Sequence, residues 1–270
     1  MIKPLMRWGI TLGVAGATFL SWGAIENLTA IALPEEEVLE KLAPVPVFTI
    51  TDEQGAPLVV SGENDAQVAG VFISHQDAEN FVNQLKTEKP ELASKVSVVL
   101  VSLGEIYQLS ESAKDQGNSL NFDYVPDEEA VNSAKTIGEA NQQPYQGGVP
   151  LFFARGGDDK GYLTFEINSQ QVIPLFFEKE RLEQMVAQFK EQQPEIADSV
   201  DIEVYPLEGV IQNLETSSNE FLEKIVFIPP SESIEFMQKV SPGVFGDEQA
   251  PPQADPEAKP EADSEAEPAE

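Results

Sequence analysis

Apolar and polar residues along the middle of the chain are arranged in short runs that are typical of β-strands. Residues 45–51 and 57–60 are two such runs on either side of a turn, and they predict a β-hairpin. Residues 149–154 and 161–166 predict a second hairpin of the same kind. Two stretches of the chain therefore begin with the same supersecondary unit.

A third apolar run follows each hairpin and leads into an amphipathic helix. These runs are residues 68–73 and 171–177. Each helix then carries apolar residues at positions i, i+3, i+4 and i+7, which form one stripe. The stripes are Ala78, Phe81, Val82 and Leu85 in the first helix and Leu182, Met185, Val186 and Phe189 in the second. Ser74 fits the N-cap of the first helix, and Pro90 and Pro194 lie beyond the helix ends.

The two stretches repeat one another at a constant offset. Val45-Pro46-Val47-Phe48 recurs 104 residues later as Val149-Pro150-Leu151-Phe152, and residues 71–96 align with residues 175–200 without a gap. Further elements follow in pairs: strands at 96–101 and 200–205, short helices at 103–109 and 207–215, and strand-plus-helix units within 120–137 and 223–240. A low-complexity stretch at 110–119 and a Gln/Pro/Gly segment at 139–148 bracket the boundary, and residues 120–138 complete the first copy.

We therefore predict an α+β fold of two pseudo-symmetric repeated halves, residues 33–138 and 139–245. Each half is expected to be a mixed or antiparallel sheet packed with helices. Gly70 and Pro174 occupy equivalent positions inside a predicted strand, although Pro lacks a backbone donor and Gly weakens a strand. A bulge or a sheet edge at that place in both halves would explain both residues.

The two ends of the chain are predicted to lie outside this fold. Lys3 and Arg7, an apolar run and Ala30-Ile31-Ala32 make residues 1–32 a secretory signal peptide with cleavage after Ala32. A retained membrane anchor is the alternative, because the apolar run is just long enough to cross a bilayer. Residues 246–270 are rich in Pro, Ala, Glu and Asp, and they are predicted to be a disordered acidic tail.

Composition narrows the possible chemistry. The 270 residues include no Cys and one His, which excludes thiolate metal sites, Cys nucleophiles and multi-His metal sites. The net charge of −31 argues against nucleic acid as a partner and limits membrane contact to peripheral contact at most. We expect no cofactor and no metal.

Catalysis has little support in the sequence. A Ser–His–Asp site could use His75 alone, and that residue begins a predicted helix and is replaced by Lys179 in the second copy. An ordinary exposed residue is the favoured interpretation of His75. The sequence also lacks a G-x-S-x-G motif and a phosphate-binding glycine loop with Lys, so we expect a protein that is not an enzyme.

Consecutive apolar residues in the predicted strands indicate that both faces of each sheet are covered, because neighbouring side chains point to opposite faces. Helices cover one face. The other face is either further core or a surface that binds extended apolar segments of other proteins, with a strand edge near Gly70 and Pro174 adding backbone pairing.

Several phrases of the sequence resemble the Tic twenty-two family of soluble chloroplast inner-envelope import components. They are VPVFTITDEQGAPLV, VFISHQDAENFVNQLK, VSLGEIYQL, GVPLFFARGG, GYLTF, VIPLFFEKE and PLEGVIQNL, in this order within residues 42–240. The Sec-like leader resembles the cyanobacterial branch. The resemblance implies a non-enzymatic, chaperone-like factor in the periplasm or thylakoid lumen, or associated with the envelope. Its partners would be unfolded or precursor proteins, and envelope translocation or outer-membrane assembly components.

The resemblance also implies apolar grooves on the faces of a pseudo-symmetric body. Our candidate groove residues are aromatic side chains of the duplicated strands: Phe48, Phe72, Phe152, Phe153, Phe176 and Phe177. Two other functions stay open, a structural adaptor that docks to a membrane complex and a hydrolase that uses His75. A rival fold, a tandem of thioredoxin-like units, would require cis peptide bonds before Pro46 and Pro150.

Overall fold

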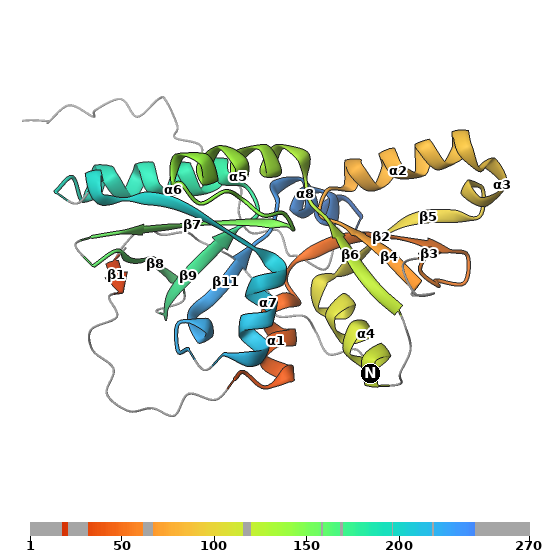
Figure 1. Ribbon diagram of the computed structural model, residues 1–270, viewed down its shortest axis with the longest axis horizontal. Helices are drawn as coiled ribbons and strands as arrows, with labels where there is room; N and C mark the ends of the chain where they lie inside the picture. The colour runs from red at the N-terminus through yellow and green to blue at the C-terminus, as the bar shows by residue number, and fades with distance from the viewer. Residues whose placement is uncertain are drawn as a thin grey trace, which may run out of the picture.

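The computed structural model describes residues 18–20, 32–61, 67–115, 120–157, 159–167, 170–195, 197–217 and 219–240. Two sheets lie side by side in the middle layer (Figure 1). Helices α2, α3, α5, α6 and α8 lie on one side of this layer, and α1, α4 and α7 lie on the other (Figure 1). The α+β class and the packing of two sheets with helices are as the sequence predicts.

The first sheet belongs to the first half of the chain. Its strands are β2 (Pro46–Asp52), β3 (Val59–Ser61), β4 (Gln67–Phe72), β5 (Val96–Ser102) and β6 (Leu120–Val125). The helices of this half are α1 (Glu35–Leu42), α2 (His75–Glu88), α3 (Pro90–Ala93), α4 (Leu103–Asp115) and α5 (Glu128–Ala140). The strand order is β3-β4-β2-β5, with β6 paired in parallel with β4 and the other pairs antiparallel.

The second sheet belongs to the second half. Its strands are β7 (Pro150–Gly156), β8 (Gly161–Ile167), β9 (Gln170–Phe176), β10 (Asp201–Pro206) and β11 (Ile225–Ile228). The helices are α6 (Lys179–Gln192), α7 (Leu207–Thr216) and α8 (Ser231–Val240), with 3₁₀ turns at Ala197–Ser199 and Leu222–Lys224. Strand β1 (Thr18–Leu20), from the segment predicted as a signal peptide, pairs antiparallel with β8. The other residues of that segment up to 31, and residues 246–270, lie outside the described residues.

Strand pairing follows the same register in the two sheets. Phe48 faces Phe72 between β2 and β4, and Phe152 faces Phe176 between β7 and β9. Leu100 faces Phe48 from β5, just as Val204 faces Phe152 from β10. Each of these pairs lies at the offset found in the sequence.

The strands that contain Gly70 and Pro174 are interior strands, so the predicted sheet edge is wrong. On one side, Gly70 of β4 faces Asp123 of β6, and Pro174 of β9 faces Val226 of β11. On the other side, β4 pairs with β3 up to Ala69 and with β2 from Val71, so Gly70 lies between the two pairings. Pro174 lies in the same way between the pairings of β9 with β8 and with β7. A missing donor or side chain is tolerated there because the ladder is interrupted. The Thr49 hydroxyl donates to the Gly70 carbonyl at 3.0 Å and replaces one ladder bond.

Three local predictions also need correction. Helix α4 continues to Asp115 and includes part of the segment predicted as low-complexity. The second arm of the first hairpin is divided between two partners. Residues 56–58 contact β2, with a bridge between Thr51 and Pro57 and the Leu58 amide donating to the Ile50 carbonyl at 2.7 Å, whereas β3 pairs with β4. The peptide bonds of the described residues, including those before Pro46 and Pro150, are trans, which argues against the thioredoxin-like comparison.

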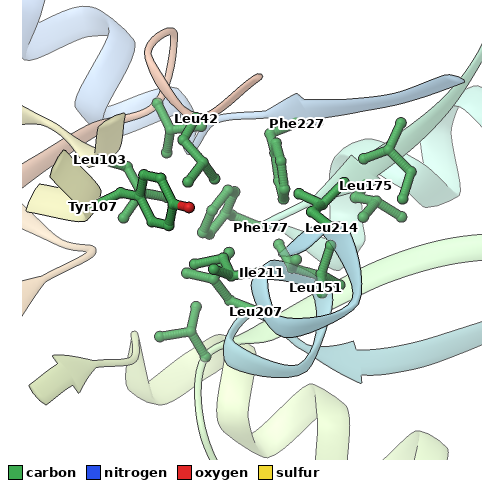
Figure 2. Close-up of a cluster of buried hydrophobic side chains, with 14 of the residues drawn as sticks. Leu42, Leu103, Tyr107, Leu151, Leu175, Phe177, Leu207, Ile211, Leu214 and Phe227 are labelled. Atoms are coloured by element: carbon green, nitrogen blue, oxygen red, sulfur yellow. The ribbon is translucent and has the colours of Figure 1, made fainter. Parts of the chain in front are cut away.

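The largest core cluster is shared by both halves. Odd-numbered strand residues and the helices α1, α4 and α7 meet in it, between the two sheets (Figure 2). Leu42, Leu103 and Tyr107 come from the first half, and Leu151, Leu207 and Phe227 come from the second (Figure 2). The two halves are therefore joined by a continuous apolar core.

The last helix of each half packs on the sheet of the other half. Ala130 and Ala134 of α5 belong to the core cluster on the second sheet. Phe236 of α8 packs against the cluster on the first sheet, where the Ser233 hydroxyl also donates to the Ile73 carbonyl at 3.2 Å. Figure 1 shows α5 beside α6 and α8 near the start of α2. The halves thus exchange one helix each.

Candidate functional surface

The six aromatic residues proposed from the sequence as groove residues are mostly core residues. Phe48, Phe72, Phe152, Phe176 and Phe177 are 5% exposed or less. Phe153 is partly buried and packs against the shared core, with its ring centroid 5.7 Å from that of Tyr162. In this conformation they do not line an open groove.

The physical reason is that both faces of each sheet are covered. Phe48 and Phe72 face α2 and α8, whereas Val47 and Val71, one residue earlier, face the shared core. The second half repeats this arrangement, with Phe152 and Phe176 beneath α5 and α6. Paired apolar residues in a strand therefore fill two core layers.

Apolar side chains are instead accessible around α2, α3 and β5 in the first half. We call this region the α2–β5 surface; it comprises Phe81, Leu92, Val96, Val98 and Leu100. Phe81 is 37% exposed and tilts over Phe72, with ring centroids 5.6 Å apart. Its counterpart in the second half, Met185, is 5% exposed. The predicted apolar stripe of α6 is buried as expected, whereas that of α2 is open at Phe81.

A hollow of about 580 Å³ lies at one end of the α2–β5 surface. Its lining residues are Lys89, Pro90, Glu91, Leu92 and Lys95, at the turn from α2 through α3 into β5. A second hollow of about 490 Å³ lies over α5 and the start of α6, and its lining is polar. The first hollow thus combines cationic and apolar groups next to a strand.

His75 has a packing role. Its ring stacks on Phe236 of α8 with centroids 4.1 Å apart and meets the edge of Phe48 at 5.1 Å. Nε2 of His75 lies 3.8 Å from Glu79. The neighbouring Ser74 hydroxyl donates to Glu232 at 3.1 Å and caps α2 by accepting from the Asp77 amide, so it is not engaged with the imidazole.

Acidic groups gather where the first turns of α2, α5 and α8 approach one another. Burial, and then the charges of Asp127, Glu232 and Glu128, raise the pKa of Asp77 above its usual range. Within the described ranges, no group of three or more His, Asp or Glu side chains is placed to hold a metal ion. A membrane-crossing helix, long and apolar enough to span a bilayer, is also not found in those ranges.

These features define an α+β protein with two helix-covered mixed sheets, a shared core and one partly open apolar surface. The chain belongs to the Tic22-like family, whose model matches residues 17–239. It is 27% identical to protein TIC 22, chloroplastic, of Pisum sativum over 233 residues, which are 85% of this chain and 87% of the relative.

Other relatives give the same result. Identity to protein TIC 22-like, chloroplastic, of Arabidopsis thaliana is 27% over 207 residues, or 73% of this chain, and the chain spans 62% of the length of that relative. The solved structure of Anabaena Tic22, described as a protein of protein transport, matches with a TM-score of 0.68 and 29% identity, covering 77% of this chain and 97% of that one. Tic22 from Plasmodium falciparum shares the fold, with a TM-score of 0.59 and 22% identity over 76% of this chain and 98% of that one.

Proposed function

We propose that this protein is a non-catalytic, chaperone-like factor of protein transport that binds apolar segments of unfolded or precursor proteins at the α2–β5 surface. The observation that carries the proposal is the exposure of Phe81 and Leu92 beside partly buried Val96, Val98 and Leu100. An accessible apolar surface rimmed by polar residues is typical of sites that bind proteins. The transport role of the Anabaena relative supports this interpretation.

The compartment belongs to the same proposal. Lys3, Arg7 and the apolar run of residues 8–25 favour export to a periplasm or thylakoid lumen, with clients on their way toward an outer membrane or across an envelope. We further propose that the halves are pseudo-symmetric copies of one duplicated unit. The shared element order and strand register support duplication.

The function is tested by suppression of client aggregation. The full chain is mixed with an unfolded outer-membrane β-barrel precursor diluted from urea, and light scattering is followed. We expect the wild-type protein to reduce scattering in proportion to its concentration. Phe81→Glu should abolish most of this effect, because a carboxylate in the apolar surface opposes burial of a client side chain.

Leu109→Glu is the matched control, since Leu109 is 52% exposed on α4, on the opposite side of the sheets. This variant should suppress aggregation as the wild type does. If the wild-type chain neither suppresses aggregation nor binds the precursor, the proposal is wrong. Crosslinking in cells that captures fixed membrane subunits but never precursors would support the structural adaptor instead.

A further inference from the structure

Strand β5 is an edge strand of the first sheet, and one side of its backbone faces away from the sheet. The Leu103 amide donates to the Val45 carbonyl at 2.8 Å, which places the hydrogen-bonded pairs of β2 and β5 at odd-numbered residues of β5. The amide and carbonyl groups of Val98 and Leu100 therefore point outward along the edge. An apolar edge strand with such groups is a template for pairing with another strand.

The corresponding strand of the second sheet, β10, is protected against such pairing. Pro206 removes one donor from this edge, and Asp201 and Glu203 add two carboxylates to the strand, which pair with Lys160 and with Arg155. Asn141, at the end of α5, donates its side-chain amide to the outward carbonyl of Ile202 at 3.4 Å. A proline, a covering helix end and two paired carboxylates thus distinguish the edge of β10.

Strand β5 lacks these features between Val96 and Val101. Ser97 and Val99 stand where β10 has Asp201 and Glu203. Ser102 stands where β10 has Pro206, and its amide donates to the Glu105 carboxylate at 2.9 Å, so the open part of the edge ends before Ser102. Core-facing residues at the same offset are alike, for example Val96 and Val200. The two edges thus differ at positions that control pairing, and also at Val101, where the second half has Tyr205.

The charge at the start of β5 differs in the same way. Residues 86–95 carry three lysines and two glutamates, or +1, whereas residues 190–199 carry one lysine and three acids, or −2. Lys89 and Lys95 line the hollow beside Leu92, and the second half has Gln193 and Ser199 at their positions. In a chain of net charge −31, this corner favours an acidic group.

We propose that β5 is a strand-addition site for an extended segment of a transported protein, with alternating apolar residues and an acidic end. The segment pairs antiparallel with β5, as β2 does on the other side, and its acidic carboxyl end lies beside Lys89 and Lys95. Backbone hydrogen bonds supply affinity, and the lysines set direction and charge preference. This inference rests on the proposed function and specifies the type of segment that is bound.

The test uses the full-length protein and a fluorescent peptide. Threonine and valine alternate in this peptide, and two glutamates form its carboxyl end. Binding is measured by fluorescence anisotropy. We expect binding that weakens with salt, and no binding of the same peptide N-methylated at alternate amides, because that peptide cannot pair with β5. Equal binding of the two peptides would overturn the proposal without any change to the protein.

Two sets of variants test the assignment to β5. Ser97→Asp with Val99→Glu transfers the residues of β10 to β5, and it should weaken peptide binding at least tenfold. Lys89→Glu with Lys95→Glu should weaken binding about tenfold for the acidic peptide and strengthen it for a peptide that ends in lysines. Lys190→Glu, on α6 in the second half, is the control and should have little effect. Circular dichroism confirms that each variant is folded.

A photo-crosslinking residue at position 97 identifies the occupant. Crosslinks to the peptide, and to precursor in the aggregation assay, support the proposal. Crosslinks to residues 241–270 of the same chain, or to a second copy, would overturn it in favour of those occupants. If the β5 variants bind the peptide normally but wild-type protein still suppresses aggregation, this inference fails and the proposed function stands. If the wild-type protein does not suppress aggregation of the precursor, the proposed function is wrong.

Discussion

Gly138 lies where the end of α5 meets the chain that turns back toward the second sheet. A Cβ atom at this position would lie 2.7 Å from the Gln143 carbonyl oxygen and 2.7 Å from the Tyr145 amide nitrogen. Both neighbours are backbone atoms, and the Gln143 amide also donates to the Gly138 carbonyl at 2.9 Å. The close approach therefore requires glycine.

We expect Gly138→Ala to lower the free energy of unfolding by about 1–3 kcal/mol, because the backbone must shift to admit a methyl group. Gly209→Ala is the control. Its Cβ would meet the side chain of Tyr205, which is 44% exposed, and no backbone atom, and alanine favours the helix. Urea denaturation measures the free energy of unfolding of both variants. A Gly138→Ala variant as stable as the wild type would contradict the close contact.

Ionisation of Tyr124 makes the stability of the folded protein fall at high pH. Burial, followed by the negative charges of Glu208 and Glu215, raises the pKa of its hydroxyl to about 12. In the unfolded chain a tyrosine loses its proton near about pH 10, so the unfolded state gains stability between these pH values. The stabilising contribution is complete below about pH 10 and is lost as the pH rises toward the folded pKa.

Tyr124→Phe should therefore reduce the loss of stability between about pH 10 and about pH 12. The measurement is the urea midpoint of both proteins across this range. Tyr205→Phe is the control, because Tyr205 is 44% exposed. Parallel pH profiles for wild type and Tyr124→Phe would show that Tyr124 does not carry this linkage.

The sequence could not predict which apolar side chains of the candidate site are exposed to solvent. The apolar pairs in β2, β4, β7 and β9 required cover on two faces, and the structure provides it with core on both sides. Phe81 was assigned to a buried stripe by its spacing, yet it is 37% exposed, because spacing specifies the face of a helix but not how far that face is covered.

At the level of elements, the exchange of α5 and α8 ties the halves together. Phe236 of α8 stands edge-on to Phe48 of β2 with centroids 5.3 Å apart and stacks on His75 of α2. Glu232 of α8 also accepts from the Gln76 amide at 3.1 Å, near the start of α2. A helix of the second half thus completes the packing of the first sheet.

We expect Phe236→Ala to lower the free energy of unfolding by about 1–3 kcal/mol, less than for a fully buried Phe because the side chain is partly exposed. Hydrogen exchange should quicken in α2 and β2, although the mutation lies far away in sequence. Val240→Ala, at the exposed end of the same helix, should change neither quantity. Faster exchange confined to α8 would indicate that the helix is not part of the first half's packing.

Sequence reasoning recovered most elements because the repeat allowed each to be read twice. Strands β4, β9, β5 and β10 lie within a residue or two of their predicted bounds, and α2 and α6 contain the predicted apolar stripes. The position of Gly70 and Pro174 in the sheet was misjudged, because strand order depends on partners distant in sequence. The exchange of α5 and α8 was missed for the same reason, since a repeat does not specify which sheet a terminal helix covers.

For the whole molecule, the question is whether the halves are independent domains. The largest core cluster draws buried side chains from α1, β2, β4 and α4 of one half and from β7, β9, α7 and β11 of the other. Separation of the halves would expose this cluster and uncover part of each sheet beneath α5 and α8. The loss of such apolar burial costs far more than the few kcal/mol by which small domains are stable.

We therefore expect residues 33–240 to unfold as one cooperative unit. Calorimetry of the full chain should give a single transition whose calorimetric and van't Hoff enthalpies agree. Residues 33–138 and 139–245 expressed separately should each remain largely unfolded, because each carries the helix that the other sheet needs, and mixing them should restore structure. Two resolved transitions, or a separately folded half, would show that the shared core is dispensable. Since α8 covers part of the first sheet, a second-half mutation such as Phe236→Ala should shift the one transition of the whole chain.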